Sequence, residues 1–152
     1  AARFVRIPLR VKLDELIPIL QIAIGPTILV SGVGLLLLTM TNRLGRIIDR
    51  TRQLGRELRS DAEPDPGRAR AQLAILLSRA AIVRAAIASA SLSVLLAAIL
   101  VIVIFLGALF GTGPAAAVAG LFIGCMAALI VSLVLFIRDV NLSLKALRLE
   151  IE

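Results

Sequence analysis

The charged and nucleophilic side chains are the first candidates for chemistry in this chain of 152 residues. It holds 17 Lys and Arg, ten Asp and Glu and a single Cys, but no His. Without His, neither a Ser-His-Asp nor a Cys-His arrangement can form, and the lone Cys125 cannot hold zinc or haem. Every carboxylate lies outside the long apolar runs, so none is an intramembrane proton carrier. The sequence therefore predicts a protein that is not an enzyme, with no catalytic residue, no metal site and no cofactor.

Three long apolar runs must instead organise the chain. They cover residues 16–41, 85–110 and 115–137, and none of them contains a charged side chain. Each exceeds the ~20 helical residues that cross the ~30 Å hydrocarbon layer of a bilayer. We therefore predict an all-α integral membrane protein with three transmembrane helices.

The segment between the first two runs, residues 42–84, carries ten arginines. Its turn at 60–67 contains two prolines and a glycine, and apolar residues recur at helical spacing on both sides of that turn. Two amphipathic faces beside one turn favour an antiparallel pair. We predict that helices 1 and 2 extend into an arginine-rich helical hairpin outside the membrane.

The remaining segments are short. Residues 1–15 form a basic N-terminal segment, and residues 111–114 form an uncharged loop. Residues 138–152 form an amphipathic C-terminal segment, whose pattern favours a helix and leaves a strand open. Because positively charged loops stay in the cytoplasm, the hairpin and the C-terminus are expected there and the short loop outside. The basic N-terminal segment weighs against this orientation.

One face of the first run is small and weakly polar. It holds Thr27, Ser31, Gly34, Thr41 and Asn42, at spacings that return to one side of a helix. In lipid, helices pack closely along such faces, and helix packing is one interpretation of this stripe of small residues. The other is a pore lining in a ring of subunits, where hydroxyl and amide groups replace part of an ion's hydration shell.

The other two runs contain ladders of small residues, which allow helices to cross closely. The ladder of the third run consists of Ala116, Gly120, Gly124 and Ala128. The weaker ladder of the second run consists of Ala86, Ser89 or Ala90, Ser93 and Ala97.

Arginines gather where the helices are expected to leave the membrane: Arg43, Arg46, Arg50, Arg79, Arg84 and Arg138. The guanidinium fork donates two hydrogen bonds at once to a phosphate, so this set predicts contact with anionic lipid headgroups or with a protein partner. Asp139 is expected at the same depth, where ion pairs can form. Nucleic acid is not expected as a partner, because five acidic residues are interleaved in 42–84 and no aromatic side chain there can stack on a base.

Three motifs carry a family resemblance: LIPILQIAIGP at 16–26, LLLTMTNRLGR at 36–46 and RDVNLSLKAL at 138–147. Together with the basic run after the second motif, they resemble the bacterial membrane family catalogued as domain of unknown function 2721. The resemblance covers roughly residues 16–152 and leaves residues 1–13 unplaced. It implies three membrane helices in a bacterial inner membrane, and it implies no activity and no catalytic residue.

These observations favour a non-enzymatic structural or accessory subunit of a membrane complex. It would assemble through its small-residue helix faces, as a homo-oligomer or against a larger membrane protein complex. The alternative is a homo-oligomeric ion channel in which helix 1 lines the pore. Both hypotheses place a multi-pass protein in a bilayer with anionic lipid headgroups, in the bacterial inner (plasma) membrane.

Overall fold

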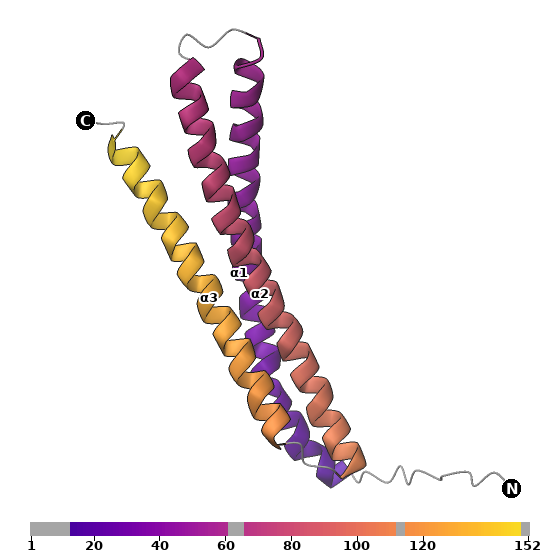
Figure 1. Ribbon diagram of the computed structural model, residues 1–152. Helices are drawn as coiled ribbons and strands as arrows, with labels where there is room; N and C mark the ends of the chain where they lie inside the picture. The colour runs from indigo at the N-terminus through magenta and orange to yellow at the C-terminus, as the bar shows by residue number, and fades with distance from the viewer. Residues whose placement is uncertain (1–12, 61–65, 112–114, 150–152) are drawn as a thin grey trace, which may run out of the picture.

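Three long α-helices make up the described part of the chain, which the computed structural model gives as residues 13–60, 66–111 and 115–149. The helices are α1 (Leu13–Glu57), α2 (Pro66–Phe110) and α3 (Ala115–Leu149) (Figure 1). Each is long and apolar enough to cross a membrane, which confirms the predicted all-α architecture with three candidate spans. Most of the predicted N-terminal segment, of the turn at 60–67 and of the loop at 111–114 lies outside the described residues.

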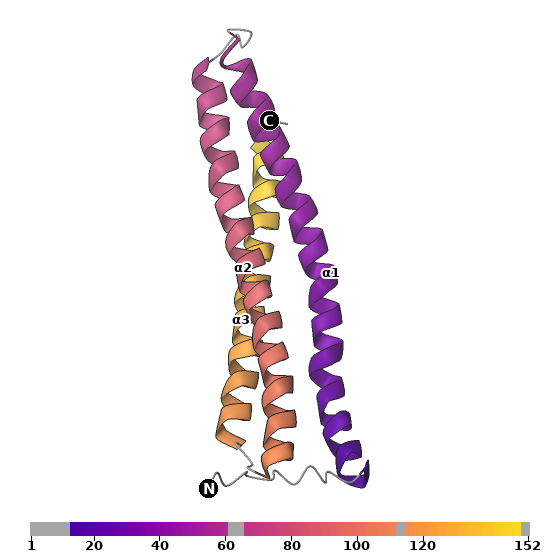
Figure 2. The same cartoon turned by 90° about the vertical axis from the view of Figure 1, so that its right-hand side faces the viewer.

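The ends of the helices follow from local chemistry. α1 remains one helix although Pro18 and Pro26 lie within it, and Figure 2 shows its ribbon unbroken. α2 begins at Pro66, a position where the missing N–H of proline has no helical partner to lose. Directly after α2, Gly111 has a φ of 62°, the left-handed conformation that commonly ends a helix and that glycine adopts without strain.

α2 makes the most extensive contacts of the three helices. It packs against both α1 and α3, whereas α1 and α3 touch each other only slightly (Figures 1 and 2). The chain order makes α1 and α2 antiparallel, so the end of α1, the start of α2 and the end of α3 lie at one end of the bundle (Figure 1). α3 is helical as far as Leu149, so the C-terminal segment continues the third helix rather than forming a strand.

The core of the bundle repeats every seven residues. Most of its buried positions follow this spacing: Val33, Met40, Ile47 and Leu54 in α1, Ala69, Val83, Ala90 and Ala97 together with Ala86, Ser93 and Leu100 in α2, and Cys125, Ser132 and Asp139 in α3. Ala23 of α1 is buried outside this series. A seven-residue period keeps one seam of each helix facing its neighbours, as in a left-handed coiled coil. Many large aliphatic side chains outside this seam are exposed, as lipid-facing side chains are expected to be.

Candidate functional site

A buried carboxylate joins all three helices. The side chain of Asp139 in α3 has no exposed surface, and its Oδ1 accepts a hydrogen bond from Arg79 Nε of α2 at 3.3 Å. Its Oδ2 lies 2.6 Å from Arg43 Nε of α1. These last two atoms do not meet the angles of a hydrogen bond, so their contact is an ion pair. Because α1 and α3 otherwise touch so little, Asp139 is the main polar link between them in the described residues.

The seven-residue repeat explains why these groups meet. Asp139 follows Cys125 and Ser132 at successive core positions of α3, so its carboxylate points into the seam. Arg43 and Arg79 each lie about one turn from a core position, beside Met40 and Val83 respectively. Their long apolar stems can follow the seam while the charged ends reach the carboxylate.

Two further contacts orient the guanidinium groups. Arg79 Nη2 donates a hydrogen bond to Ser143 Oγ at 2.9 Å, and Arg43 Cζ lies 5.8 Å from the centroid of the Phe136 ring, within cation–π range. The side chains of Arg43 and Arg79 are only 24% and 16% exposed. We call Asp139, Arg43, Arg79 and Ser143 the Asp139 cluster. Since it holds two guanidiniums against one carboxylate, an excess of positive charge remains.

A cleft of about 390 Å³ opens beside the Asp139 cluster, between the three helices. We call it the arginine cleft, and it is lined by Arg43, Arg46, Ile47, Arg50, Leu76, Arg79 and Ser143. Arg46 and Arg50 follow Arg43 at one-turn spacing on α1, so their charges lie in a row. Neither forms an ion pair with any of the described residues. This arrangement can bind an anion, because several guanidinium donors converge on it with little compensating charge.

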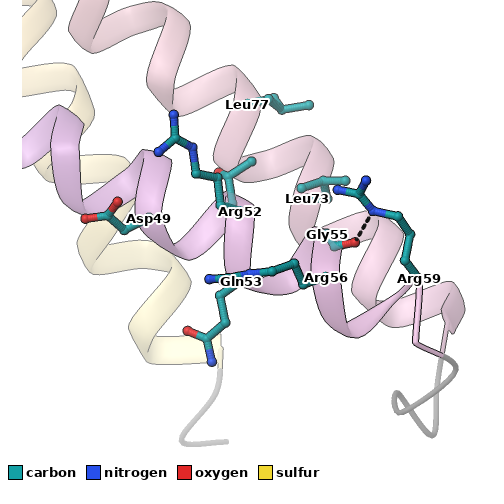
Figure 3. Close-up of a pocket in the computed structure, with 9 residues that line it drawn as sticks. Asp49, Arg52, Gln53, Gly55, Arg56, Arg59, Leu73 and Leu77 are labelled. Atoms are coloured by element: carbon teal, nitrogen blue, oxygen red, sulfur yellow. Dashed lines mark hydrogen bonds between the residues drawn. The ribbon is translucent and has the colours of Figure 1, made fainter.

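A second, larger groove of about 820 Å³ lies farther along α1 and α2 (Figure 3). Its arginines are Arg52 and Arg56 of α1 and Arg59 in the turn directly after α1, and Leu73 and Leu77 contribute from α2. Arg59 turns back along α1 and donates from Nε to the Gly55 carbonyl at 3.1 Å, as Figure 3 shows. We call this second groove the outer groove. Asp49 also lines it, so the outer groove carries charges of both signs. Its α2 wall is apolar, because Leu73 and Leu77 form that wall.

The six arginines predicted at the membrane surface therefore separate into two groups. Arg43, Arg46, Arg50 and Arg79 share the arginine cleft. Arg84 instead borders a shallow groove whose walls include Leu44 and Ile48 of α1. Arg138 is exposed and has no ion pair within the described residues.

The stripe of small residues in the first apolar run, which we call the α1 stripe, faces away from the bundle. Thr27, Ser31, Gly34, Thr41 and Asn42 are all exposed, because α1 packs on α2 through its seven-residue seam instead. The hydroxyl of Thr27 donates to the Ala23 carbonyl at 2.8 Å, and that of Ser31 donates to the Thr27 carbonyl at 3.4 Å.

The α3 ladder is only partly used within the chain. Ala116 and Gly120 are exposed, and Gly124 and Ala128 are half-buried. A Cβ atom at Gly124 would lie 3.6 Å from Leu96 Cδ1 of α2, whereas one at Gly120 would meet no atom within 4 Å.

The α2 ladder packs against α3 within the chain. Its buried members are Ala86, Ala90, Ser93 and Ala97. Ser93 Oγ donates to the Cys125 carbonyl at 3.0 Å, and Ser132 Oγ of α3 donates to the Ala86 carbonyl at 2.8 Å. The sequence reasoning missed the roles of Ser132 and of Asp139 as buried partners, although Cys125, Ser132 and Asp139 follow one another at intervals of seven residues, which was a usable signal.

A comparison with models of known protein families shows to which family the chain belongs. Residues 23–149 match the family model described as a protein of unknown function, DUF2721. The chain belongs to the DUF2721 family. The matched segment contains the whole Asp139 cluster and the arginine cleft, and it confirms the resemblance drawn from the three motifs. No curated protein and no solved structure matches the chain.

Proposed function

We propose that this protein is a non-enzymatic structural or accessory subunit of a membrane complex. The observation that carries the proposal is the outward orientation of its small-residue faces. The α1 stripe and the first half of the α3 ladder are left uncovered by the chain's own packing. Among residues 13–60, 66–111 and 115–149, the polar groups that do converge are arginines around one carboxylate, which suit binding better than bond breaking.

The physical reason is the way helices associate in lipid. Lipid tails are as apolar as leucine side chains, so helices meet where small residues let their backbones approach closely. Ideal Cβ atoms at Gly34 and Gly120 have no neighbouring atom within 4 Å, so both sites can accept the backbone of another helix. That helix can belong to a second copy of this chain or to a larger membrane protein.

Leucine at Gly34 or Gly120 is therefore expected to prevent assembly. Neither glycine contacts the chain's own bundle, so the fold should persist while the approach of another helix is blocked. The particle mass in mild detergent, compared with the 16.1 kDa chain, measures the effect. Gly32→Leu is the matched control, since Gly32 is also open and exposed but lies on a different side of α1. A native particle that is a single chain without other polypeptides, or one unchanged in Gly34→Leu and Gly120→Leu, would overturn the proposal.

The proposal includes a topology in which residues 42–84 form a cytoplasmic hairpin on a bacterial inner membrane. α1 contains 45 residues, which is about 68 Å at 1.5 Å per residue, more than twice the ~30 Å of a hydrocarbon layer. The ten arginines of this segment favour the cytoplasmic side.

Labelling of introduced cysteines tests this topology. Ser60 and Ala115 are exposed and lie at opposite ends of the bundle, and the native Cys125 is buried. A membrane-impermeant maleimide is expected to label Ala115→Cys in intact spheroplasts and Ser60→Cys only in inverted vesicles. The unsubstituted protein, which should not react, is the control. The opposite pattern of labelling would place the arginines outside the cell.

A homo-oligomeric ion channel is the second candidate function, and one observation favours it. The hydroxyl hydrogens of Thr27 and Ser31 are used within α1, so the oxygen lone pairs of these exposed groups remain available to an ion. A ring of α1 stripes would then line the pore. Conductance of the purified homo-oligomer in planar bilayers separates this candidate from the accessory subunit.

A further inference from the structure

We propose that the arginine cleft binds the headgroup of an anionic phospholipid that carries two phosphate charges. Four arginines line the cleft, and the single carboxylate beside it, Asp139, is shared between Arg43 and Arg79. Three positive charges are therefore uncompensated among the described residues that face the cleft. Arginine suits this ligand because its planar fork bonds two phosphate oxygens at once.

The Asp139 cluster fixes half of the donors before any ligand arrives. Asp139 and Ser143 hold the guanidinium of Arg79, and Asp139 and Phe136 hold that of Arg43. Ser143 Oγ accepts a hydrogen bond from Arg79, so its own hydroxyl hydrogen remains free to donate into the cleft. Donors that are already oriented lose less conformational entropy on binding.

Arg46 and Arg50 supply the second half of the site. Both are exposed, both line the cleft, and neither is paired with a described carboxylate. Three arginines in a row on one helix repel one another at one-turn spacing. A ligand with two negative charges removes this repulsion, whereas a ligand with one charge leaves most of it.

The depth of the cleft favours a lipid over a soluble phosphate. Arg43 directly follows Asn42, the last residue of the uncharged stretch, and Arg50 lies two turns farther on. At 1.5 Å per residue the cleft therefore extends about 12 Å from the edge of the apolar layer, a depth that includes the headgroup region, which is ~5–8 Å thick on each side of a bilayer. Basic pockets between membrane helices at this depth are suited to lipid headgroups.

The outer groove is less suited to the same ligand. It lies farther from the membrane, includes the carboxylate of Asp49, and has Leu73 and Leu77 in its wall. Its Arg59 is already bonded to the Gly55 carbonyl. Its α1 arginines therefore provide a matched set of charges on the same helix that lie outside the arginine cleft.

Native mass spectrometry of the full chain in detergent micelles tests the proposal. Diphosphatidylglycerol is the probe, with phosphatidylglycerol at equal total charge as the comparison, and the measurement counts lipids bound per chain. We expect one retained diphosphatidylglycerol, and about a tenfold or greater loss of affinity in Arg46→Gln/Arg50→Gln, because each substitution removes charged hydrogen bonds. Arg52→Gln/Arg56→Gln removes the same charge outside the cleft, and its affinity should change by less than about twofold.

Three outcomes would overturn the proposal. Equal losses in the two double variants would mean that the lipid responds to overall charge and not to the cleft. Equal retention of the two lipids by the unchanged protein would remove the requirement for two phosphate charges. Tight binding of inorganic phosphate that is lost in Arg46→Gln/Arg50→Gln, without any retained diphosphatidylglycerol, would assign the cleft to a soluble anion. Since lipids are counted per chain, all these results are independent of whether the chain assembles into a larger complex.

Discussion

Asp139→Ala is expected to destabilise the bundle by about 3–5 kcal/mol, the usual cost of removing one partner from a buried ion pair. Asp139 has no exposed surface and is the partner of both Arg43 and Arg79, so its loss leaves two guanidiniums facing each other at the centre of three helices. It also removes the main polar link between α1 and α3. The measurement is the free energy of unfolding in reconstituted micelles titrated with dodecyl sulfate.

The control for this prediction is Asp49→Ala, which removes an exposed carboxylate that is in no ion pair within the described residues. Its effect should stay within about 0.5 kcal/mol. A triple variant with Asp139→Leu, Arg43→Leu and Arg79→Met is expected to recover most of the stability, since well-packed apolar residues often replace a buried ionic group without loss. If Asp139→Ala unfolds at the same dodecyl sulfate fraction as the unchanged protein, the carboxylate does not hold the helices together.

The three helices were predictable because the bilayer imposes a simple physical requirement on length. An uncharged run of more than ~20 residues has few alternatives to a membrane helix. The two prolines in α1 did not interrupt it, and the small residues noted in the second run at 86, 90, 93 and 97 are buried in α2. The ends of the helices followed from Gly111 and Pro66, whose backbone preferences are local.

The packing face of α1 was not predictable in the same way. In a soluble helix the polar side identifies the solvent face, but in lipid both the core and the outer surface are apolar. The sequence drew attention to the small residues of the stripe at Thr27 and Ser31, whereas the chain packs through larger residues such as Val33 and Met40. Only the seven-residue spacing of the buried side chains distinguishes the packing face of α1 from the stripe. That spacing becomes recognisable once the positions in α2 that face it are known.

The arginine cleft was predicted in part. The membrane-surface arginines were identified by type and position, and Asp139 was expected at their depth. Which arginines share one site depends on how three helices are rotated about their axes, and this rotation is set by side-chain packing along the whole seam. The structure accordingly groups Arg43 with Arg79 and leaves Arg84 and Arg138 apart.

Ala86→Leu is the second prediction with a large expected effect, because it tests the close approach of α2 and α3. Ala86 has no exposed surface, and its carbonyl accepts the hydrogen bond from Ser132 Oγ at 2.8 Å. Three additional carbon atoms at this position must push α3 away, at a cost of about 1–3 kcal/mol for overpacking. The separation should also break the Ser132 hydrogen bond, which adds about 1 kcal/mol.

Ala98→Leu is the matched control, since Ala98 is also an alanine of α2 but is exposed and lines none of the grooves described above. The same substitution there adds apolar surface toward lipid and should leave the unfolding free energy within about 0.5 kcal/mol of the unchanged protein. Equal stability of Ala86→Leu and the unchanged protein would contradict the packing of α3 on this ladder. Asp139 lies seven residues, or about two turns, beyond Ser132 along the same seam, so a displaced α3 also moves its carboxylate. Ala86→Leu is therefore expected to weaken retention of the anionic phospholipid in the arginine cleft although Ala86 does not line that cleft.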